Sequence, residues 1–391
     1  MITIPQETLA DALNAVTRAS LKSSTIAALA LVRIDASATG EIKFSCFNGE
    51  TAAQAKVYAH CDDDASVCVD AQTLKAVADT MLGEVTLKIE AKSLVIENGA
   101  NRTNLRIVEE TIPTIGDEQV ETIASLTGLA LRSLARIIPF ASTDDSRQIL
   151  QVLYLHFEGN QVRAQAADGF SAGYVEESLA NTAASADVSL PASFARLLSG
   201  LVDDRDTLLV QKLGDNRFLF QITHAESAKH LTLATVTAAS DFPAKQVMQL
   251  FQGSKSSVVA HLLLPKNSLA QTVKMVGAMG TVNTFIKASN GSVKIASAET
   301  STGQARNVLE GTASGQDAKA WLSAAFLKRI TDACKAEVRI GIANEKSPVL
   351  FSEGNFTAMI MPLVIENAKD PFANEDEPIA ISLPAFEAAA A

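Results

Sequence analysis

One segment of the chain has the spacing of a catalytic nucleophile. Gly169-Phe-Ser-Ala-Gly173 fits the G-x-S-x-G pattern, in which a serine on a sharp strand-to-helix turn attacks a carbonyl carbon. The pattern requires a helix after the serine, but Tyr174-Val-Glu-Glu-Ser178 alternates as a strand does. We therefore interpret residues 169–173 as an ordinary turn, and a hydrolase that uses Ser171 as the weakest hypothesis.

No residue pattern in the sequence matches a metal site or a redox site. The five histidines lack H-x-x-x-H spacing, and no glycine-rich loop matches a phosphate cradle. Cys46, Cys61, Cys68 and Cys334 form no C-x-x-C pair, which predicts free thiols in a reducing cytoplasm. We expect no metal and no cofactor. Because no nucleophile, base and orienting group come together, an enzyme is the weaker class.

The elements that must position any site repeat three times. A turn glycine, an alternating strand and a polar turn begin at Gly40, at Gly159 and at Gly291. A short amphipathic helix follows at residues 70–82, 191–202 and 323–335. Another amphipathic helix comes before each strand, at residues 6–22, 125–138 and 265–279. Independent elements at the same offsets indicate three α+β domains, at residues 1–118, 123–247 and 255–365.

Two connectors and a tail complete this division. The connectors are the stretches around Gly116 and around residues 252–257. Residues 366–391 hold an acidic run and three prolines, a composition that predicts a disordered tail. No stretch of 18 apolar residues exists, so we expect no membrane span, and we expect no signal peptide at the N-terminus.

Positive charge concentrates on the predicted helices. The chain has 33 Lys+Arg and 44 Asp+Glu, a net charge of −11. The six helices carry eleven bases and five acids, a net charge of +6. The bases are Arg18, Lys22, Lys75, Arg132, Arg136, Arg196, Lys266, Lys274, Lys328, Arg329 and Lys335. A basic face on an acidic protein favours binding to the phosphate backbone without reading sequence, whereas acidic turns such as Asp203-Asp204 are predicted to be solvated.

Several short segments then resemble one family. They are Phe140-Ala-Ser-Thr-Asp-Asp-Ser-Arg-Gln-Ile-Leu150, Ala166-Ala-Asp-Gly169, Ser240-Asp-Phe-Pro243, Ser347-Pro-Val-Leu-Phe351 and Met361-Pro-Leu363. In order and spacing these segments are similar to those of the bacterial sliding clamp, the beta subunit of DNA polymerase III. The resemblance covers about residues 1–365.

The resemblance implies a ring-shaped homodimer. Helices would line the hole and antiparallel sheets would face outward, so the ring would encircle double-stranded DNA. The first ten of the bases named above, Arg18 to Arg329, would contact the DNA, and Lys335 is left out of this set. The ring would slide, tether the replicative polymerase and be opened by a clamp loader, in the cytoplasm at the nucleoid.

The resemblance also implies a pocket for partner peptides between the second and third domains. Its residues would be Leu150, Ala167, Gly169, Phe170, Pro243, Val247, Met359, Met361, Pro362 and Leu363. The chain departs from the family where His-Arg-Leu is replaced by Phe170-Ser-Ala172. Ile381-Ser-Leu-Pro-Ala-Phe386 looks like a clamp-binding peptide without its leading Gln, so the tail is a candidate competitor for this pocket. The alternative hypothesis is a repeat-built scaffold for protein interactions that does not bind DNA.

Overall fold

The structure is a computed structural model that describes residues 1–115, 119–226, 229–237, 241–365 and 369–373. The chain divides into two compact units. The first unit comprises Met1–Gln249 and Gly354–Thr357, and the second comprises Leu250–Glu353 and the chain from Ala358 onward.

A five-stranded antiparallel sheet belongs to the first repeat, with the order β5-β1-β7-β8-β9. Its strands are β1 (Ile2–Pro5), β5 (His60–Cys61), β7 (Glu84–Glu90), β8 (Ser93–Asn98) and β9 (Asn101–Arg106). Strand β9 is an edge strand, because β8 is its only partner in this sheet.

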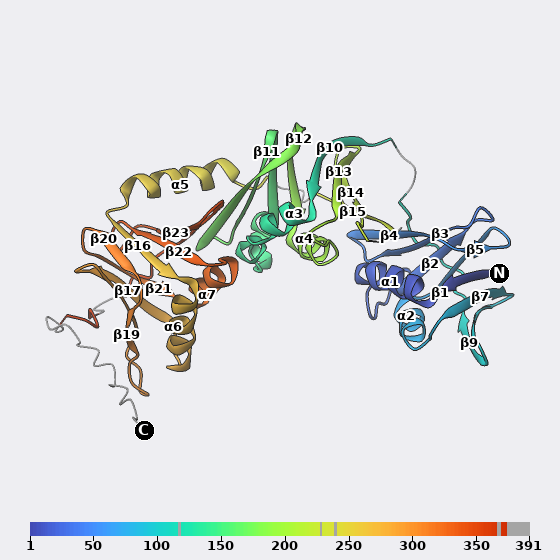
Figure 1. The fold of residues 1–391 in the computed structure, drawn as a ribbon, viewed down its shortest axis with the longest axis horizontal. Helices are drawn as coiled ribbons and strands as arrows, with labels where there is room; N and C mark the ends of the chain where they lie inside the picture. Colours follow the sequence, from blue (N-terminus) through green and yellow to red (C-terminus); the bar gives the residue numbers. More distant parts are fainter. Residues whose placement is uncertain (116–118, 227–228, 238–240, 366–368, 374–391) are drawn as a thin grey trace, which may run out of the picture. The chain divides into compact units, whose positions relative to one another are not determined.

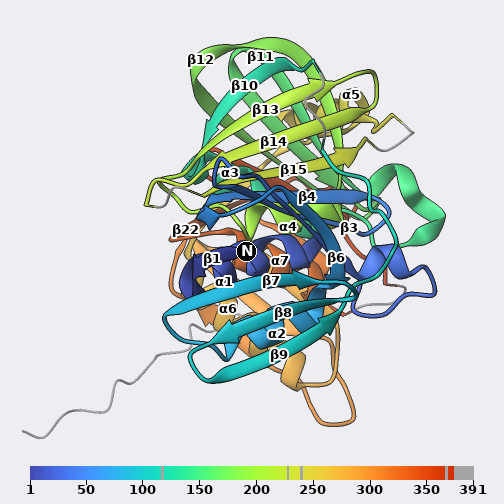
Figure 2. The ribbon, with the colours of Figure 1, turned by 90° about the vertical axis from the view of Figure 1, so that its right-hand side faces the viewer.

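An eight-stranded sheet joins the first two repeats, with the order β10-β13-β14-β15-β4-β3-β2-β6 (Figure 2). Strands β2 (Leu31–Ala36), β3 (Glu41–Phe47), β4 (Thr51–Tyr58) and β6 (Ala65–Asp70) come from the first repeat, and β10 (Glu121–Thr127), β13 (Thr207–Leu213), β14 (Arg217–Thr223) and β15 (His230–Val236) from the second. The junction is the antiparallel pair β4–β15, with Ala53 opposite Leu233. This shared sheet explains why one unit contains two repeats.

A long hairpin completes the second repeat. Strands β11 (Val152–Ala167) and β12 (Ser171–Pro191) pair from Val152–Pro191 to Ala167–Ala172. At the tight end of the hairpin, the Asp168 carboxylate accepts hydrogen bonds from the N–H groups of Phe170 and Ser171 (2.9 and 2.6 Å). Residues 169–173 therefore form the hairpin turn and the start of β12, which confirms the interpretation as a turn.

The first unit carries two helix pairs on its sheets. They are α1 (Gln6–Val16) with α2 (Ala71–Asp79), and α3 (Gly128–Ala135) with α4 (Ala192–Ser199). Leu9, Leu13 and Val16 form the fully buried stripe of α1, at the spacing of one helix face. The 3₁₀ segments are η1 (Thr17–Ala19), η2 (Ala27–Ala30), η3 (Ile138–Phe140) and η4 (Asp145–Leu150).

The second unit repeats this design (Figure 1). One sheet has the order β19-β18-β17-β21, from β17 (Asn283–Ser289), β18 (Ser292–Ser297), β19 (Arg306–Leu309) and β21 (Ala318–Ser323). Strands β24 (Phe356–Ile360), β23 (Val349–Glu353), β22 (Glu337–Ile342), β16 (Ala260–Pro265) and β20 (Thr312–Gly315) follow one another in a second sheet. Helices α6 (Lys266–Ala278) and α7 (Ala324–Ala333) contact each other.

Corresponding elements confirm the repeat. The helix pairs α1/α2, α3/α4 and α6/α7 recur, and the order β6-β2-β3-β4 of the first repeat matches β21-β17-β18-β19 of the third. Gly40, Gly159 and Gly291 all have positive φ (85°, 57° and 73°), a backbone conformation that other residues rarely adopt. The α+β fold class with antiparallel sheets is therefore as predicted.

Several helix boundaries and one connector differ from the prediction. The helices are shorter than expected: α1 ends at Val16 and α3 begins only at Gly128, because residues 121–127 form β10. The expected connector at residues 252–257 instead ends a helix that was not predicted, α5 (Ala244–Ser257). Burial of Val247, Phe251 and Ser254, at helical spacing, explains why this segment is helical.

Candidate nucleic-acid interface

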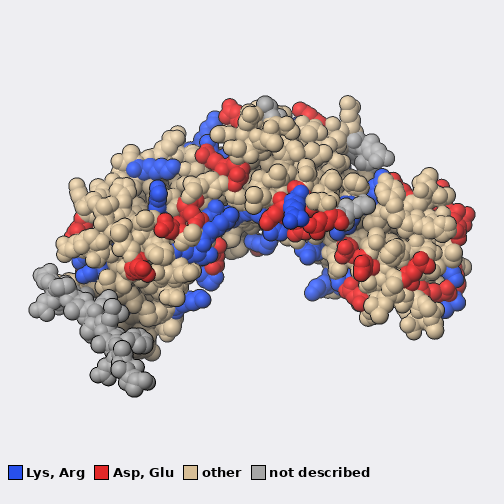
Figure 3. All heavy atoms as spheres, in the orientation of Figure 1, with Lys and Arg blue, Asp and Glu red and all other residues tan. Residues whose placement is uncertain are grey.

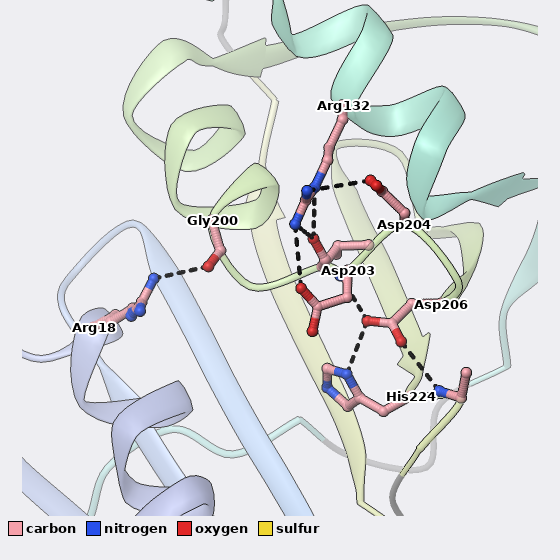
Figure 4. Close-up of polar contacts among 9 residues, drawn as sticks. Arg18, Arg132, Gly200, Asp203, Asp204, Asp206 and His224 are labelled. Carbon is pink, nitrogen blue, oxygen red and sulfur yellow. Dashed lines mark hydrogen bonds and ion pairs between the residues drawn. The ribbon is translucent and has the colours of Figure 1, made fainter.

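Arg132, on α3, is held by carbonyl and carboxylate oxygens rather than projecting freely. Its guanidinium donates hydrogen bonds to the Val202 carbonyl (3.2 and 3.3 Å) and lies 3.2 Å from a carboxylate oxygen of Asp203 and of Asp204 (Figure 4). These acids remain largely exposed but face the arginine, so the prediction of a purely solvated turn is incomplete for them. Arg132 is already partly neutralised.

A buried carboxylate shapes the loop that holds Arg132. Asp206 is 3% exposed and accepts hydrogen bonds from the N–H groups of Asp203 (2.8 Å) and Ala225 (3.1 Å). Its other contact is His224 Nδ1 at 2.9 Å. Although burial opposes ionisation, these N–H groups and the imidazole lower the pKa of Asp206 below its ordinary value. Asp206 thus fixes the position of Asp203.

The three predicted bases of the first repeat differ in their polar contacts and in the element that carries them. Arg18 follows α1 on η1 and donates a hydrogen bond to the Gly200 carbonyl (3.0 Å), which links the first two repeats (Figure 4). Lys75 on α2 pairs with Asp79 at 2.5 Å. Lys22 is exposed in the loop beyond η1, and the expectation that it belongs to a helix is wrong.

Arg196 and Arg136, two predicted bases of the second repeat, differ in the contacts of their side chains. The Arg196 side chain on α4 is exposed and makes no hydrogen bond or ion pair within the described part of the chain. Arg136 instead caps α3 at its C-terminus. It donates a hydrogen bond to Asn355 Oδ1 (3.4 Å), and its guanidinium lies 4.9 Å from the centre of the Phe356 ring.

The third repeat carries more unpaired positive charge. Lys274 is exposed and Lys266 half-buried on α6, and neither has an ion pair within the described residues. On α7, Lys328 pairs with Asp332 at 2.5 Å, and the Arg329 guanidinium stacks on the Phe326 ring at 4.9 Å.

Shorter helices change the charge count. Within their observed bounds the six repeat helices carry seven bases and four acids, so their net charge is +3 rather than +6. Arg18, Lys22, Arg136 and Lys335 lie outside the α-helices. Figure 3 shows acidic and basic atoms interspersed on the surface that carries α3 and α4. Among the helix pairs, the basic excess is largest on α6/α7, whereas the charged residues of α1 are only Glu7 and Asp11.

Six residues expected in the peptide pocket lie in the first unit. Phe170 is 52% exposed and stacks on Arg147, with 5.1 Å between the guanidinium carbon and the ring centre. Arg147 also donates a hydrogen bond to the Asp168 carbonyl (2.8 Å), which makes it a residue that sequence reasoning missed. Gly169, next to it, has φ +90°, and a side chain there would meet Arg147. Ala167 and Val247 are buried, whereas Leu150 and Pro243 are half-buried.

The remaining four lie in the second unit. Met359 is buried in β24, and Met361 is 41% exposed just beyond it. Pro362 and Leu363 are half-buried, and the Leu363 N–H donates a hydrogen bond to the Trp321 carbonyl (2.7 Å). The pocket for partner peptides, expected to combine these ten residues, stays a prediction. The candidate tail peptide at 381–386 lies outside the described residues.

Ser171 and the four cysteines, which were first considered for chemistry, are buried in the structure. Ser171 is 3% exposed, and its hydroxyl lies 3.2 Å from Asp168 Oδ1. The four cysteines are free and buried, and burial raises the pKa of the Cys46 and Cys68 thiols, which keeps them protonated. In the part of the chain that the structure describes, no three metal-ligating side chains come together. Among the same residues, no helix has the length and apolar composition needed to cross a bilayer.

Helix pairs on antiparallel sheets, repeated three times along one chain, define the sliding-clamp fold. Among solved structures, the chain is similar to the DNA polymerase sliding clamp from Bacillus subtilis (15% identity, TM-score 0.83) and to the DNA polymerase III beta subunit from Thermotoga maritima (16%, 0.82). It is also similar to a chain from Eubacterium rectale assigned as a DNA polymerase III beta subunit (16%, 0.81). Each match covers 93% of this chain and 99% of the other. By sequence, no family model and no curated protein matches.

Proposed function

We propose that the chain is a processivity factor that encircles duplex DNA and tethers a replicative polymerase. The observation that supports this most is the fold, which follows solved sliding clamps over 93% of the chain. Such a protein is an accessory subunit with no catalytic site of its own. It acts in the cytoplasm, at the nucleoid, and a clamp loader opens it.

The internal repeat supports a specific way to close the ring. Within the chain, β15, the last strand of the second repeat, pairs with β4 of the first. The counterpart of β15 in the first repeat is β9, and the counterpart of β4 in the third repeat is β19. Both β9 and β19 are edge strands in this chain. Pairing β9 of one copy with β19 of a second would repeat the β15–β4 junction and cover both edges.

DNA contacts of the expected kind are weak and non-specific. Cations on the helices attract phosphates without reading bases, and a topological ring needs no tight contact. Arg196, Lys266 and Lys274 are the described bases best placed to act, because no carboxylate competes for them. The partly neutralised Arg132, Lys75 and Lys328 would contribute less, which favours sliding over tight binding.

Partner binding is proposed at the residues that the resemblance implies. Exposed apolar side chains at Phe170 and Met361 are suited to receive the hydrophobic residues of a short partner peptide from a polymerase or loader. The guanidinium of Arg147 packs against the ring of Phe170.

A topological experiment tests the proposal. In solution the protein should have twice the 41.3 kDa mass of the chain. When loaded on nicked circular DNA it should stay bound through a wash in high salt, and cutting the circle should release it. Binding that is equal on circular and linear DNA, or a monomer at micromolar concentration, would contradict a closed ring.

A further inference from the structure

The outer face of the β19-β18-β17-β21 sheet carries an unusual row of like charges. Lys287, in β17, lies opposite Lys294 in β18 and opposite Lys319 in β21. Cationic side chains directly opposite one another in a sheet repel, so such a row destabilises the sheet unless an anion lies against it. A second row, two residues along each strand and on the same face, is apolar and aligns Phe285 with Ala296 and Trp321.

Residues near the end of the described chain match both rows. Asp370 Oδ2 lies 2.9 Å from Lys287 Nζ and 3.7 Å from Lys319 Nζ. Phe372 is 4% exposed and packs with Phe285 and Ala296, against which Trp321 also packs. The Asp-Pro-Phe segment therefore places its carboxylate on the cationic row and its ring on the apolar row.

Further contacts fix the shape of the segment. The Phe372 N–H donates a hydrogen bond to Asp370 Oδ1 (2.9 Å), and the Ala373 N–H to the Asp370 carbonyl (3.1 Å), so the three residues form a turn. Lys294 Nζ lies 5.4 Å from the centre of the Phe372 ring. These residues lie within the stretch 366–391 that composition predicts to be disordered, yet Asp370 and Phe372 make specific contacts with the sheet.

The surface beside this segment has room for a longer peptide. Asp370 lines a cavity of about 860 Å³ together with Lys287, Lys319 and Lys346. Asp370 and Pro371 also line a second cavity of about 640 Å³, together with Trp321 and Arg306.

We propose that this face, defined by Lys287, Lys294, Lys319, Phe285 and Trp321, is a binding site for short peptides that carry a carboxylate two residues before an aromatic ring. Residues 370–372 occupy it as an internal ligand. A partner protein with an Asp-x-Phe peptide binds by displacing them. The inference does not depend on DNA binding, and the site differs from the pocket proposed above.

Full-length variants test this site directly. Asp370→Ala combined with Phe372→Ala removes the internal ligand and leaves every residue of the face in place. A fluorescein-labelled peptide with the sequence of residues 367–375 should then bind the double variant at least tenfold more tightly than the parent, because a tethered ligand competes at an effective concentration near millimolar. Adding Lys287→Glu to the double variant should reduce that binding at least tenfold.

Two controls test the specificity of binding, and the fluorescence of Trp321 reports whether the site is occupied. The same peptide with its Asp and Phe exchanged should not bind, and Lys369→Ala, at an exposed neighbour, should leave the parent's affinity unchanged. Trp321 is the only tryptophan of the chain, so its emission should shift to the red in the double variant and return when the peptide binds.

Several outcomes would overturn the proposal. They are equal affinity of parent and double variant, no binding to either, or binding that Lys287→Glu does not weaken. Trp321 emission that changes on dilution would show exchange between copies and contradict internal occupancy. If the double variant loses the far-UV circular dichroism of the parent, Asp370→Ala, which keeps Phe372, is judged by the same criteria.

Discussion

The guanidinium of Arg132 lies 3.2 Å from a carboxylate oxygen of Asp203, although 71 positions separate the two residues. An arginine that is already paired must exchange one anion for another when it meets a phosphate. Its net contribution to DNA binding is therefore smaller than that of an unpaired cation, and the acids beside it reduce the affinity further.

The first prediction compares paired and unpaired bases. Arg196→Glu should weaken binding to a short DNA duplex more than Arg132→Glu does, and Asp203→Asn with Asp204→Asn should strengthen it about two- to fivefold, since exposed charges contribute up to about 1 kcal/mol each. Titrations at several salt concentrations measure this. Equal effects of the two arginine variants would show that the ion pairs do not persist in solution.

A related prediction separates the clamp from the non-binding scaffold. Arg132, Arg136 and Arg196 all changed to Glu should abolish low-salt binding to a short linear duplex while leaving the dimer intact by mass, because the phosphate contacts are lost. If this binding survives, these arginines do not face the DNA. A scaffold that never binds DNA would instead show neither duplex binding nor retention on circular DNA, even for the parent chain.

The third prediction concerns ring closure. Val308→Pro in β19 should shift the protein toward monomer, because proline removes a backbone donor and disrupts an edge that must pair. Ser66→Pro in the edge strand β6, outside the proposed junction, is the matched control and should stay dimeric. Analytical ultracentrifugation distinguishes the two; a dimeric Val308→Pro variant would argue for another interface.

The fourth prediction concerns the Asp206 carboxylate. Asp206→Asn should lower the free energy of unfolding at pH 7 by about 1–3 kcal/mol, because a buried charged acceptor with three partners is lost. Because folding lowers the pKa of Asp206, its stabilisation is complete above the ordinary value near 3.9 and disappears as pH falls through the folded value. The difference between parent and variant, measured by urea denaturation, should therefore shrink below pH 4. Asp63→Asn, at an exposed acid, should show little difference at either pH.

The fifth prediction tests the partner pocket. Phe170→Ala and Met361→Ala should each weaken a polymerase-derived clamp-binding peptide about tenfold, because each removes an exposed apolar contact. Fluorescence anisotropy measures the affinity. Tyr58→Ala removes an equally exposed ring elsewhere and should leave the affinity unchanged.

Local patterns in the sequence predicted the repeat and its parts. Gly40, Gly159 and Gly291 mark turns that require positive φ, and Asp70 caps α2 by accepting a hydrogen bond from the Thr73 N–H (2.7 Å). Such signals act over a few residues, so they can be read without knowing the fold. The turn at Gly169–Gly173 was predicted for the same reason.

Features that depend on distant residues needed the tertiary structure. Helix α5 contains Gly253 and a run of serines, which read as a connector, and the buried faces of Val247 and Phe251 decide its conformation. The acids that neutralise Arg132, and the lysine row that binds Asp370, lie far from their partners along the chain. Composition predicts whether a segment can fold alone, but the register of β17, β18 and β21 decides that residues 370–372 bind. The sequence by itself determined which modules form; only their pairing in space determined which charges are left free.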